Sequence, residues 1–227
     1  MNMKLSVSTE SDDQLFERME KKLYTGVICD TLDELGYRNQ AMNERLRPLV
    51  NEYVIVGRAK TILAVDVYYE NDNPYEMEIK SLDSIKPGEV AVVCTNQSKN
   101  NGIWGELLST AAKMRGGRGA IVDGLIRDTK KIVELGFPVF CAGFKPVDSR
   151  GRGLVVDYDC PVEVGGILVK PGDVIFADRD GVAVIPSQVL HETVQKAVEK
   201  VERENNTRRE LLEGKLLKDV YEKYGVL

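Results

Sequence analysis

Short apolar runs alternate with helix-like segments through the middle of the chain, and this alternation limits the fold more than any other feature. In chain order the segments are an apolar run at 90–94, a helix-like stretch at 105–115, a run at 120–122, a helix-like stretch at 129–135 and a run at 138–141. A helix inserted between two strands gives the chain enough length to cross over and pair them in parallel. The sequence therefore predicts an α/β core built on parallel strands.

Segments on both sides of this core complete the expected fold. The elements expected before it are helices at 12–23 and 25–36 and strands at 53–56 and 61–67. Thr25 can cap the second helix and Gly36 can end it. Glycine-rich turns between 153 and 185 indicate hairpins, so a mixed sheet is expected. Ser187 can cap a long C-terminal helix. The chain is thus expected to form one domain, 1–227, with N-terminal helices at 12–36, an α/β core at 53–186 and a helical tail at 187–227.

Composition excludes several classes of function. The chain has 227 residues and a net charge of -5, which does not suit a broad basic surface for nucleic acid. No apolar run reaches the roughly 18 residues of a membrane-spanning helix, and the polar residues 1–13 lack the apolar centre of a signal peptide. We therefore expect a cytoplasmic protein that binds neither nucleic acid nor a membrane. The 4 cysteines have no C-x-x-C spacing and are expected to be buried free thiols.

The single histidine, His191, removes many kinds of catalytic site. A metal centre with several histidines cannot form within one chain, and a Ser-His-Asp triad would need a histidine that lies in a strongly helical, charged segment. Acid–base or metal chemistry must then use carboxylates, Arg, Lys, Tyr, Cys or bound water. Lys60, Lys80 and Lys145 can form Schiff bases in principle. Nothing in their contexts singles one out, so surface positions are expected for all three.

The candidate site follows the run at 120–122, where a turn is expected at Asp123-Gly124 and where Arg127 and Asp128 stand side by side. Folds of the α/β class place ligands beyond the carboxyl ends of their strands. Arg127 is suited to bind the carboxylate of a small organic acid, with a surface salt bridge as the alternative. Asp128 is suited either to cap the next helix or to bind Mg²⁺ or Mn²⁺. The residues alone leave these alternatives open.

A second candidate segment is 102–108, which opens a helix with glycine near its start. Exposed backbone N–H groups at such a helix start form an anion site. The alternative is the ordinary beginning of a helix, with Trp104 packed in the core.

Three segments in this region, taken together, resemble one protein family. They are Gly-Glu-Leu-Leu at 105–108, Gly-Ala-Ile-Val-Asp-Gly-Leu-Ile-Arg-Asp at 119–128 and Gly-Phe-Pro-Val-Phe at 136–140, and the likeness continues over nearly the whole chain. The chain is similar to the family of regulator of ribonuclease activity A and 4-hydroxy-4-methyl-2-oxoglutarate aldolase. The resemblance implies a swivelling-domain-like β/β/α sandwich with mixed sheets, N-terminal helices and a long C-terminal helix. It also implies a homotrimer, or a hexamer made of two trimers, with sites between subunits.

The resemblance further implies a role for each matching residue. The residues that would bind the α-keto acid end of the substrate are Gly105, Glu106, Leu107, Leu108 and Arg127. Asp128 would hold a divalent Mg²⁺ or Mn²⁺ ion, mostly through waters. Glu106 would hold a metal-bound water or relay a proton, completing a catalytic set with Arg127 and Asp128. Glu204, on the tail, would reach the site of a neighbouring subunit.

The implied activity is that of a metal-dependent carbon–carbon lyase. It would cleave 4-hydroxy-2-oxo acids such as 4-hydroxy-4-methyl-2-oxoglutarate to pyruvate and would decarboxylate oxaloacetate, because a metal can stabilise the pyruvate enolate in both reactions. The alternative within the family is a protein that regulates a ribonuclease by binding and has no catalysis. One departure bears on this choice: the family often has a carboxylate three residues after the aspartate, where this chain has Lys131.

Overall fold

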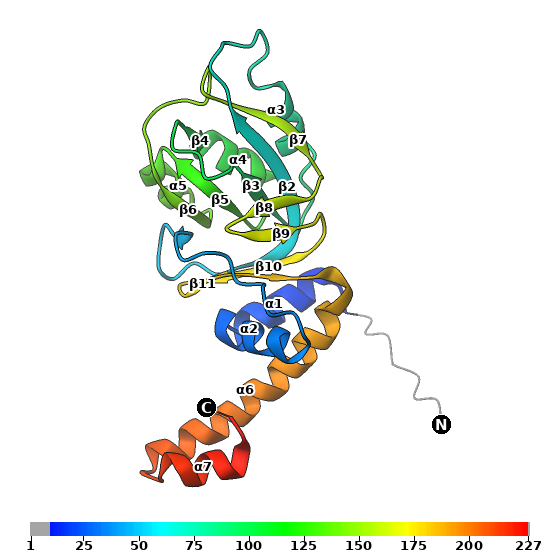
Figure 1. Cartoon of the computed structure of the whole chain (residues 1–227), viewed down its shortest axis with the longest axis vertical. Coiled ribbons are helices and arrows are strands. Elements are labelled where there is room, and N and C mark those ends of the chain that lie inside the picture. Colours follow the sequence, from blue (N-terminus) through cyan, green and yellow to red (C-terminus); the bar gives the residue numbers. More distant parts are fainter. Residues whose placement is uncertain (1–9, 227) are drawn as a thin grey trace, which may run out of the picture.

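Parallel strands form the centre of the computed structural model, which describes residues 10–226 (Figure 1). In sheet order the four strands are β6 (Val139–Phe144), β5 (Gly119–Ile126), β3 (Glu89–Cys94) and β2 (Ile55–Asp66). The helices that connect them are α3 (Glu76–Asp83), α4 (Glu106–Met114) and α5 (Thr129–Leu135). This arrangement confirms the predicted α/β core, because each parallel crossover carries a helix.

Further strands extend this sheet and make it mixed. On one side β1 (Arg47–Pro48) runs antiparallel to β6, and the short β4 (Gly102–Trp104) pairs with β5. The antiparallel strands on the other side are β7 (Gly153–Tyr158), β10 (Val174–Asp178) and β11 (Gly181–Ile185). A separate hairpin is formed by β8 (Val162–Val164) and β9 (Ile167–Val169). The hairpins predicted in the second half of the chain are therefore confirmed.

Different layers cover the two faces of the parallel sheet. Val93 belongs to an apolar cluster that includes Ile132 of α5. Its neighbour Val92 and the adjacent Ile121 belong to another cluster, which includes Val164 of the β8–β9 hairpin. Successive residues of a strand face opposite sides of a sheet. The unbroken apolar runs seen in the sequence thus belong to strands that are buried on both faces.

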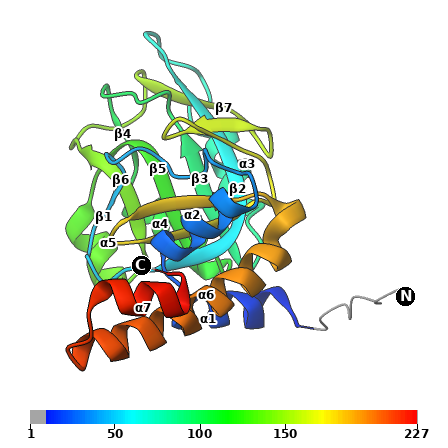
Figure 2. The ribbon, with the colours of Figure 1, turned by 60° about the horizontal axis from the view of Figure 1, so that its bottom comes forward.

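Helices from the two ends of the chain pack together against β10 and β11 (Figures 1 and 2). They are α1 (Asp12–Lys22), α2 (Thr25–Glu34) and α6 (Leu190–Leu212). Phe16, Ile28 and Val194 from these helices share one cluster with Phe176 of β10. The expected long C-terminal helix is α6, which continues past the core and is followed by a second helix, α7 (Leu217–Tyr224). Within residues 10–226, no helix is both long enough and apolar enough to cross a membrane.

Two predicted element boundaries inside the sheet are wrong. The strands expected at 53–56 and 61–67 are one continuous strand, β2. The turn expected at Asp123-Gly124 lies inside β5, where the register with β6 shifts between Val122 and Leu125. In both places glycine stands within a strand, which is where glycine permits a close backbone approach or an irregularity.

Two predicted helix caps are also wrong. Thr25 lies inside α2, and both its N–H and its hydroxyl donate hydrogen bonds to the carboxylate of Asp178, at 2.8 and 2.6 Å. The N-cap of that helix is Tyr24, whose side chain makes no capping bond. Ser187 begins a short 3₁₀ turn (Ser187–Val189) ahead of α6. The expected free thiols are free, with Cys94 and Cys141 buried and Cys29 and Cys160 partly buried.

Candidate active site

Asp128 adopts an unusual backbone conformation directly after β5. It has φ 57° and ψ 29°, in the left-handed region, and it occupies the N-cap position of α5. Its side chain nevertheless makes no capping hydrogen bond to that helix. The capping interpretation of Asp128 is therefore wrong. Its left-handed backbone costs an L-residue about 1–2 kcal/mol.

The start of α4 lies against this carboxylate. Gly105 is the N-cap of α4, and a Cβ atom added to it would lie 2.9 Å from Asp128 Oδ2 and 3.3 Å from Arg127 Cγ. The backbone N–H of Arg127 also donates to the carbonyl of Trp104, at 2.9 Å. A helix N-terminus carries partial positive charge and orphan N–H groups. The two segments singled out in the sequence, 102–108 and 127–128, thus form one site.

Arg127 points its guanidinium into a group of acids. Its Nη2 lies 3.0 Å from Asp148 Oδ1 and its Nε lies 3.9 Å from Asp128 Oδ2, with the Arg127 side chain 38% exposed. The hydroxyl of Tyr75 donates a hydrogen bond to the other oxygen of Asp148. Arg127 therefore does form a salt bridge, as one alternative predicted, but this bridge is part of the site and is partly buried.

Three residues of this group were not predicted from the sequence: Tyr75, Glu78 and Asp148. Burial alone raises the pKa of Asp148, but the hydrogen bond from Tyr75 and the charge of Arg127 outweigh it, so the pKa lies below its usual value. Glu78 behaves in the opposite way. Its burial and the nearby charge of Asp148 raise its pKa to about 7, with Arg127 acting against them. The site therefore contains one carboxyl that is held ionised and one that can carry a proton near neutral pH.

The remaining residues at the start of α4 have distinct environments. Glu106 is half-buried, and its Oε1 accepts a hydrogen bond from the Thr110 hydroxyl at 2.9 Å. Leu107 is 76% exposed, whereas Trp104 is fully buried and donates its Nε1–H to Ser109 Oγ at 2.8 Å. Trp104 therefore belongs to the core, as the simpler alternative had it. Its buried hydrogen bond holds the strand β4 against the first turn of the helix.

Glu204 and Lys131 lie apart from this group. Glu204 is on α6, where its carboxylate accepts a hydrogen bond from the Tyr24 hydroxyl. Figure 1 shows α6 extending away from the end of the core that carries β4 and α5. Lys131 is exposed on α5 and has no ion pair with any residue between 10 and 226. Neither side chain joins Arg127 and Asp128 within one chain.

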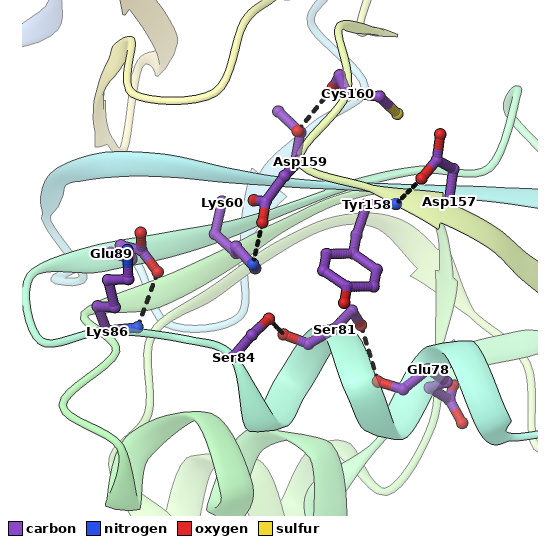
Figure 3. Close-up of polar contacts among 11 residues, drawn as sticks. Lys60, Glu78, Ser81, Ser84, Lys86, Glu89, Asp157, Tyr158, Asp159 and Cys160 are labelled. Atoms are coloured by element: carbon purple, nitrogen blue, oxygen red, sulfur yellow. Dashed lines mark hydrogen bonds and ion pairs between the residues drawn. The ribbon is translucent and has the colours of Figure 1, made fainter.

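One of the lysines considered for Schiff-base chemistry is buried, and Lys145 is held by its backbone next to the site, where its N–H donates to the carbonyl of Ile126. Lys60 is 3% exposed, so the expected surface position is wrong for it. Its Nζ lies 2.7 Å from Asp159 Oδ2 and 4.7 Å from the centre of the Tyr158 ring (Figure 3). Lys80 is exposed, and Lys145 donates to the carbonyl of Lys99. The ion pair of Lys60 serves the β2–β7 edge of the sheet.

A hard divalent cation suits the chemistry of Asp128. Among residues 10–226, no three Asp, Glu, Cys or His side chains gather closely enough to enclose a metal. Mg²⁺, however, is commonly held by one or two carboxylates and keeps several waters. Asp128 offers one exposed carboxylate that makes no capping bond, beside the glycine that leaves room for it. The residues present therefore fit a cation bound mainly through water.

Comparison with known proteins places the chain in a family. Residues 25–184 match the family model named RraA-like, described as Aldolase/RraA. The chain belongs to this family. The match contains every residue of the site described above, including the three that the sequence did not reveal.

Individual relatives carry two kinds of name. A protein of Halalkalibacterium halodurans named "Putative 4-hydroxy-4-methyl-2-oxoglutarate aldolase" is 33% identical over 176 residues, which are 78% of this chain and 79% of that protein. Protein DlpA of Legionella pneumophila is 29% identical over 87% of this chain, but the chain spans only 32% of its length. The crystal structure of Streptomyces coelicolor RraAS2, described as an unusual member of the RNase ES inhibitor RraA protein family, has a TM-score of 0.78 at 30% identity and covers 88% of this chain and 98% of its own.

A further solved structure supports the fold alone. An uncharacterized protein from Pseudomonas syringae has a TM-score of 0.84 at 23% identity, covering 97% of this chain and 100% of its own. Together with RraAS2, it agrees with the mixed α/β architecture that the sequence predicts, including the N-terminal helices and the long C-terminal helix.

Proposed function

We propose that this chain is a divalent-metal-dependent aldolase that cleaves 4-hydroxy-2-oxo acids, such as 4-hydroxy-4-methyl-2-oxoglutarate, to pyruvate, and that it also decarboxylates oxaloacetate. The observation that carries the proposal is the close approach of Gly105 to Arg127 and Asp128. It brings together a helix N-terminus, a guanidinium and a carboxylate that does not cap its own helix. The name of the Halalkalibacterium relative supports the same class of reaction.

Substrate binding follows from the charges at this point. The guanidinium of Arg127 would bind the C1 carboxylate, since its planar fork matches that group and cannot lose its proton. The N–H groups of residues 105–108 would face the 2-oxo oxygen, on which negative charge grows as the enolate forms. Leu107 and Leu108 would contact the carbon chain of the substrate. A Mg²⁺ or Mn²⁺ ion held by Asp128 would add electrostatic stabilisation of the enolate.

Cleavage requires one proton to leave the substrate and another to return. As the C4 hydroxyl loses its proton, the C3–C4 bond breaks to give a carbonyl product and the enolate of pyruvate, and a proton added at C3 then gives pyruvate. Glu106, the first residue of α4, is the carboxylate proposed to take the first proton through a water molecule. Decarboxylation of oxaloacetate leaves the same enolate, so the same charges serve both reactions.

A homotrimer, or a hexamer of two trimers, forms part of the proposal. Glu204 lies on α6, which extends away from the site of its own chain, so it would act at a neighbour's site. Light scattering should give three or six times the chain mass of 25.3 kDa. If the protein is a monomer and still has full turnover, Glu204 has no role in the proposed site.

The decisive experiment measures pyruvate release from a panel of 4-hydroxy-2-oxo acids and oxaloacetate, with and without Mg²⁺. Asp128→Asn is the informative variant, because Asn tolerates the left-handed backbone and the fold is kept. Glu134→Gln, an exposed site on the same helix, is the control. We expect Asp128→Asn and Arg127→Ala to lose at least about 100-fold in turnover. Near-normal turnover in either variant would show that the assignment is wrong.

The second candidate is regulation of a ribonuclease by protein binding, without catalysis. It is favoured by the description of RraAS2 and by Lys131, which stands where the family often has a carboxylate. The same panel distinguishes the two. If no acid in it is cleaved at any Mg²⁺ or Mn²⁺ concentration, the regulator is the better description of this chain.

A further inference from the structure

Arg127 has an acidic neighbour to which the proposed mechanism gives no role. Asp148 Oδ1 lies 3.0 Å from Arg127 Nη2, and its other oxygen accepts the hydrogen bond from Tyr75. The three residues come from distant parts of the chain. Tyr75 immediately precedes α3, Arg127 follows β5, and Asp148 lies between β6 and β7. The fold thus brings a tyrosine, a carboxylate and a guanidinium into one row.

Asp148 is fixed on more than one side. Besides Tyr75 and Arg127, the backbone N–H of Ser149 donates to its Oδ1 at 2.9 Å. Only about a third of the Asp148 side chain is exposed, at 33%. Such a carboxylate differs from a surface partner that follows a mobile arginine, because its own position is set by the neighbouring backbone and by Tyr75.

The ion pair with Asp148 still leaves Arg127 free to bind substrate. It uses Nη2, while Nε is directed toward Asp128 at 3.9 Å. The guanidinium makes no hydrogen bond to any residue that the structure describes, and Asp148 acts on it by charge. A guanidinium has five N–H donors in a rigid fork. Holding one corner therefore orients the plane of the group and leaves donors for an incoming carboxylate.

A nearby acid, Glu78, does not form an equivalent ion pair with Arg127. It lies one helical turn after Tyr75 on α3 and is nine-tenths buried, among side chains that include Leu82, Trp104 and Leu108. None of the described residues makes a hydrogen bond to its carboxyl group. Burial disfavours its charged form. Asp148 is thus the acid that is both ionised and in contact with the arginine.

We propose that Asp148, held in place by Tyr75, is a positioning residue that orients Arg127 toward the carboxylate of the substrate. This inference rests on the proposed function, in which Arg127 binds that carboxylate. An arginine held in its binding orientation loses less side-chain freedom when the substrate arrives. The benefit therefore lies in substrate affinity and alignment, and the chemical step itself does not use Asp148.

The test compares three variants. Asp148→Ala removes the ion pair with Arg127, and Tyr75→Phe removes the hydrogen bond that the Tyr75 hydroxyl donates to Asp148. Asp83→Ala is the matched control, because it breaks an Asp–Arg ion pair of 2.9 Å, with Arg115, at the far end of the same helix α3. The measurements are KM and kcat for pyruvate release, thermal unfolding, and the binding of oxalate, a dicarboxylate analogue of the enolate, by calorimetry in the presence of Mg²⁺.

We expect Asp148→Ala to lower kcat/KM by about 10- to 100-fold, mostly through KM, since misplacing a binding group by about 1 Å has effects of this size. Tyr75→Phe should lower it several-fold, and Asp148→Asn, which keeps an acceptor for Nη2, should recover part of the loss. Oxalate binding should weaken in parallel. Asp83→Ala should leave KM and oxalate binding unchanged.

Equal KM and equal oxalate affinity in Asp148→Ala and Asp83→Ala would overturn the proposal, whatever happens to thermal stability. Failure of the proposed function looks different: the wild type itself would release no pyruvate from any substrate. In that case a selective loss of oxalate binding in Asp148→Ala would still support the positioning role. A wild type that binds no oxalate would overturn both.

Discussion

Gly105→Ala is the sharpest single test of the site, because the added methyl group has one predictable effect. Gly105 has φ -145° and ψ -170°, an extended conformation that alanine adopts without strain. The new Cβ atom would lie 2.9 Å from Asp128 Oδ2 and 3.3 Å from Arg127 Cγ. Ordinary contacts between carbon and other heavy atoms begin near 3.4 Å. The carboxylate must therefore move by about 0.5 Å, since van der Waals repulsion is steep below that distance.

The size of the effect follows from this displacement. A misplacement of about 1 Å can cost about 100-fold in rate, so half that shift corresponds to about tenfold in kcat/KM, or about 1.4 kcal/mol. Stability should change less. Alanine is a poorer N-cap than glycine, by about 0.5–1 kcal/mol, which lowers Tm by roughly 1–4 °C in a chain of this length.

The assay is pyruvate release with saturating Mg²⁺, measured beside thermal unfolding. Gly26→Ala is the matched control, because it also lies in the first turn of a helix and its Cβ would meet Tyr24 at an ordinary 3.4 Å. That variant should keep its activity and should not lose stability. If Gly105→Ala folds and retains kcat/KM within a factor of about two, the reaction does not occur between Gly105 and Asp128, and the reasoning is refuted.

Three other substitutions each test a buried polar group. The pKa of Glu78 is raised from 4.5 to about 7, so the folded chain keeps a proton that the unfolded chain has lost, and wild-type stability should fall as pH rises through that window. Glu78→Gln should abolish this fall, gaining about 2–3 kcal/mol on the wild type between pH 4 and pH 8 in urea unfolding. Asp159→Ala leaves Lys60 buried without its ion pair and should cost about 1–2 kcal/mol in the same assay, reduced because Asp159 is half exposed. Ser109→Ala leaves the buried Nε1–H of Trp104 without an acceptor and should lower unfolding free energy by about 1–3 kcal/mol; no loss in calorimetric Tm would contradict it.

The parallel core could be predicted because its signals are local. The strands β3, β5 and β6 are continuous apolar runs, and glycine follows the connecting helices α4 and α5, so composition over a few residues is enough there. The helix α3 was not predicted, and it ends at Ser84 without a glycine. The errors arise where glycine has a tertiary role. A Cβ on Gly57 would lie 2.5 Å from the carbonyl oxygen of Gly88, and one on Gly124 would lie 2.6 Å from Thr95 Oγ1. Both glycines permit close approach within the sheet, whereas the sequence pattern indicated strand ends.

The residues of the candidate site also fall into those that could be predicted from the sequence and those that could not. Residues 105–108 and 127–128 could be predicted, because a helix start and the end of a strand are visible in the sequence and because the segments resemble a family. Tyr75, Glu78 and Asp148 could not. Glu78 lies on α3, Tyr75 immediately before it and Asp148 on the loop before β7, and nothing in their neighbours distinguishes them from surface residues. Their relation to Arg127 exists only after the strands have aligned.

The backbone of Asp128 bears on the choice between catalysis and regulation by binding. A conventional N-cap would contribute about 1 kcal/mol to α5, and a conventional backbone would avoid about 1–2 kcal/mol of left-handed strain. At Asp128 the chain has neither the capping hydrogen bond nor the conventional backbone. Asp159 is also left-handed, at φ 55°, but its carboxylate is held by the buried Lys60. The carboxylate of Asp128 has a weaker ion pair, at 3.9 Å from the partly exposed Arg127. Strain that the fold does not use for its own stability is typical of functional sites, which favours a small ligand at this carboxylate over a flat binding surface.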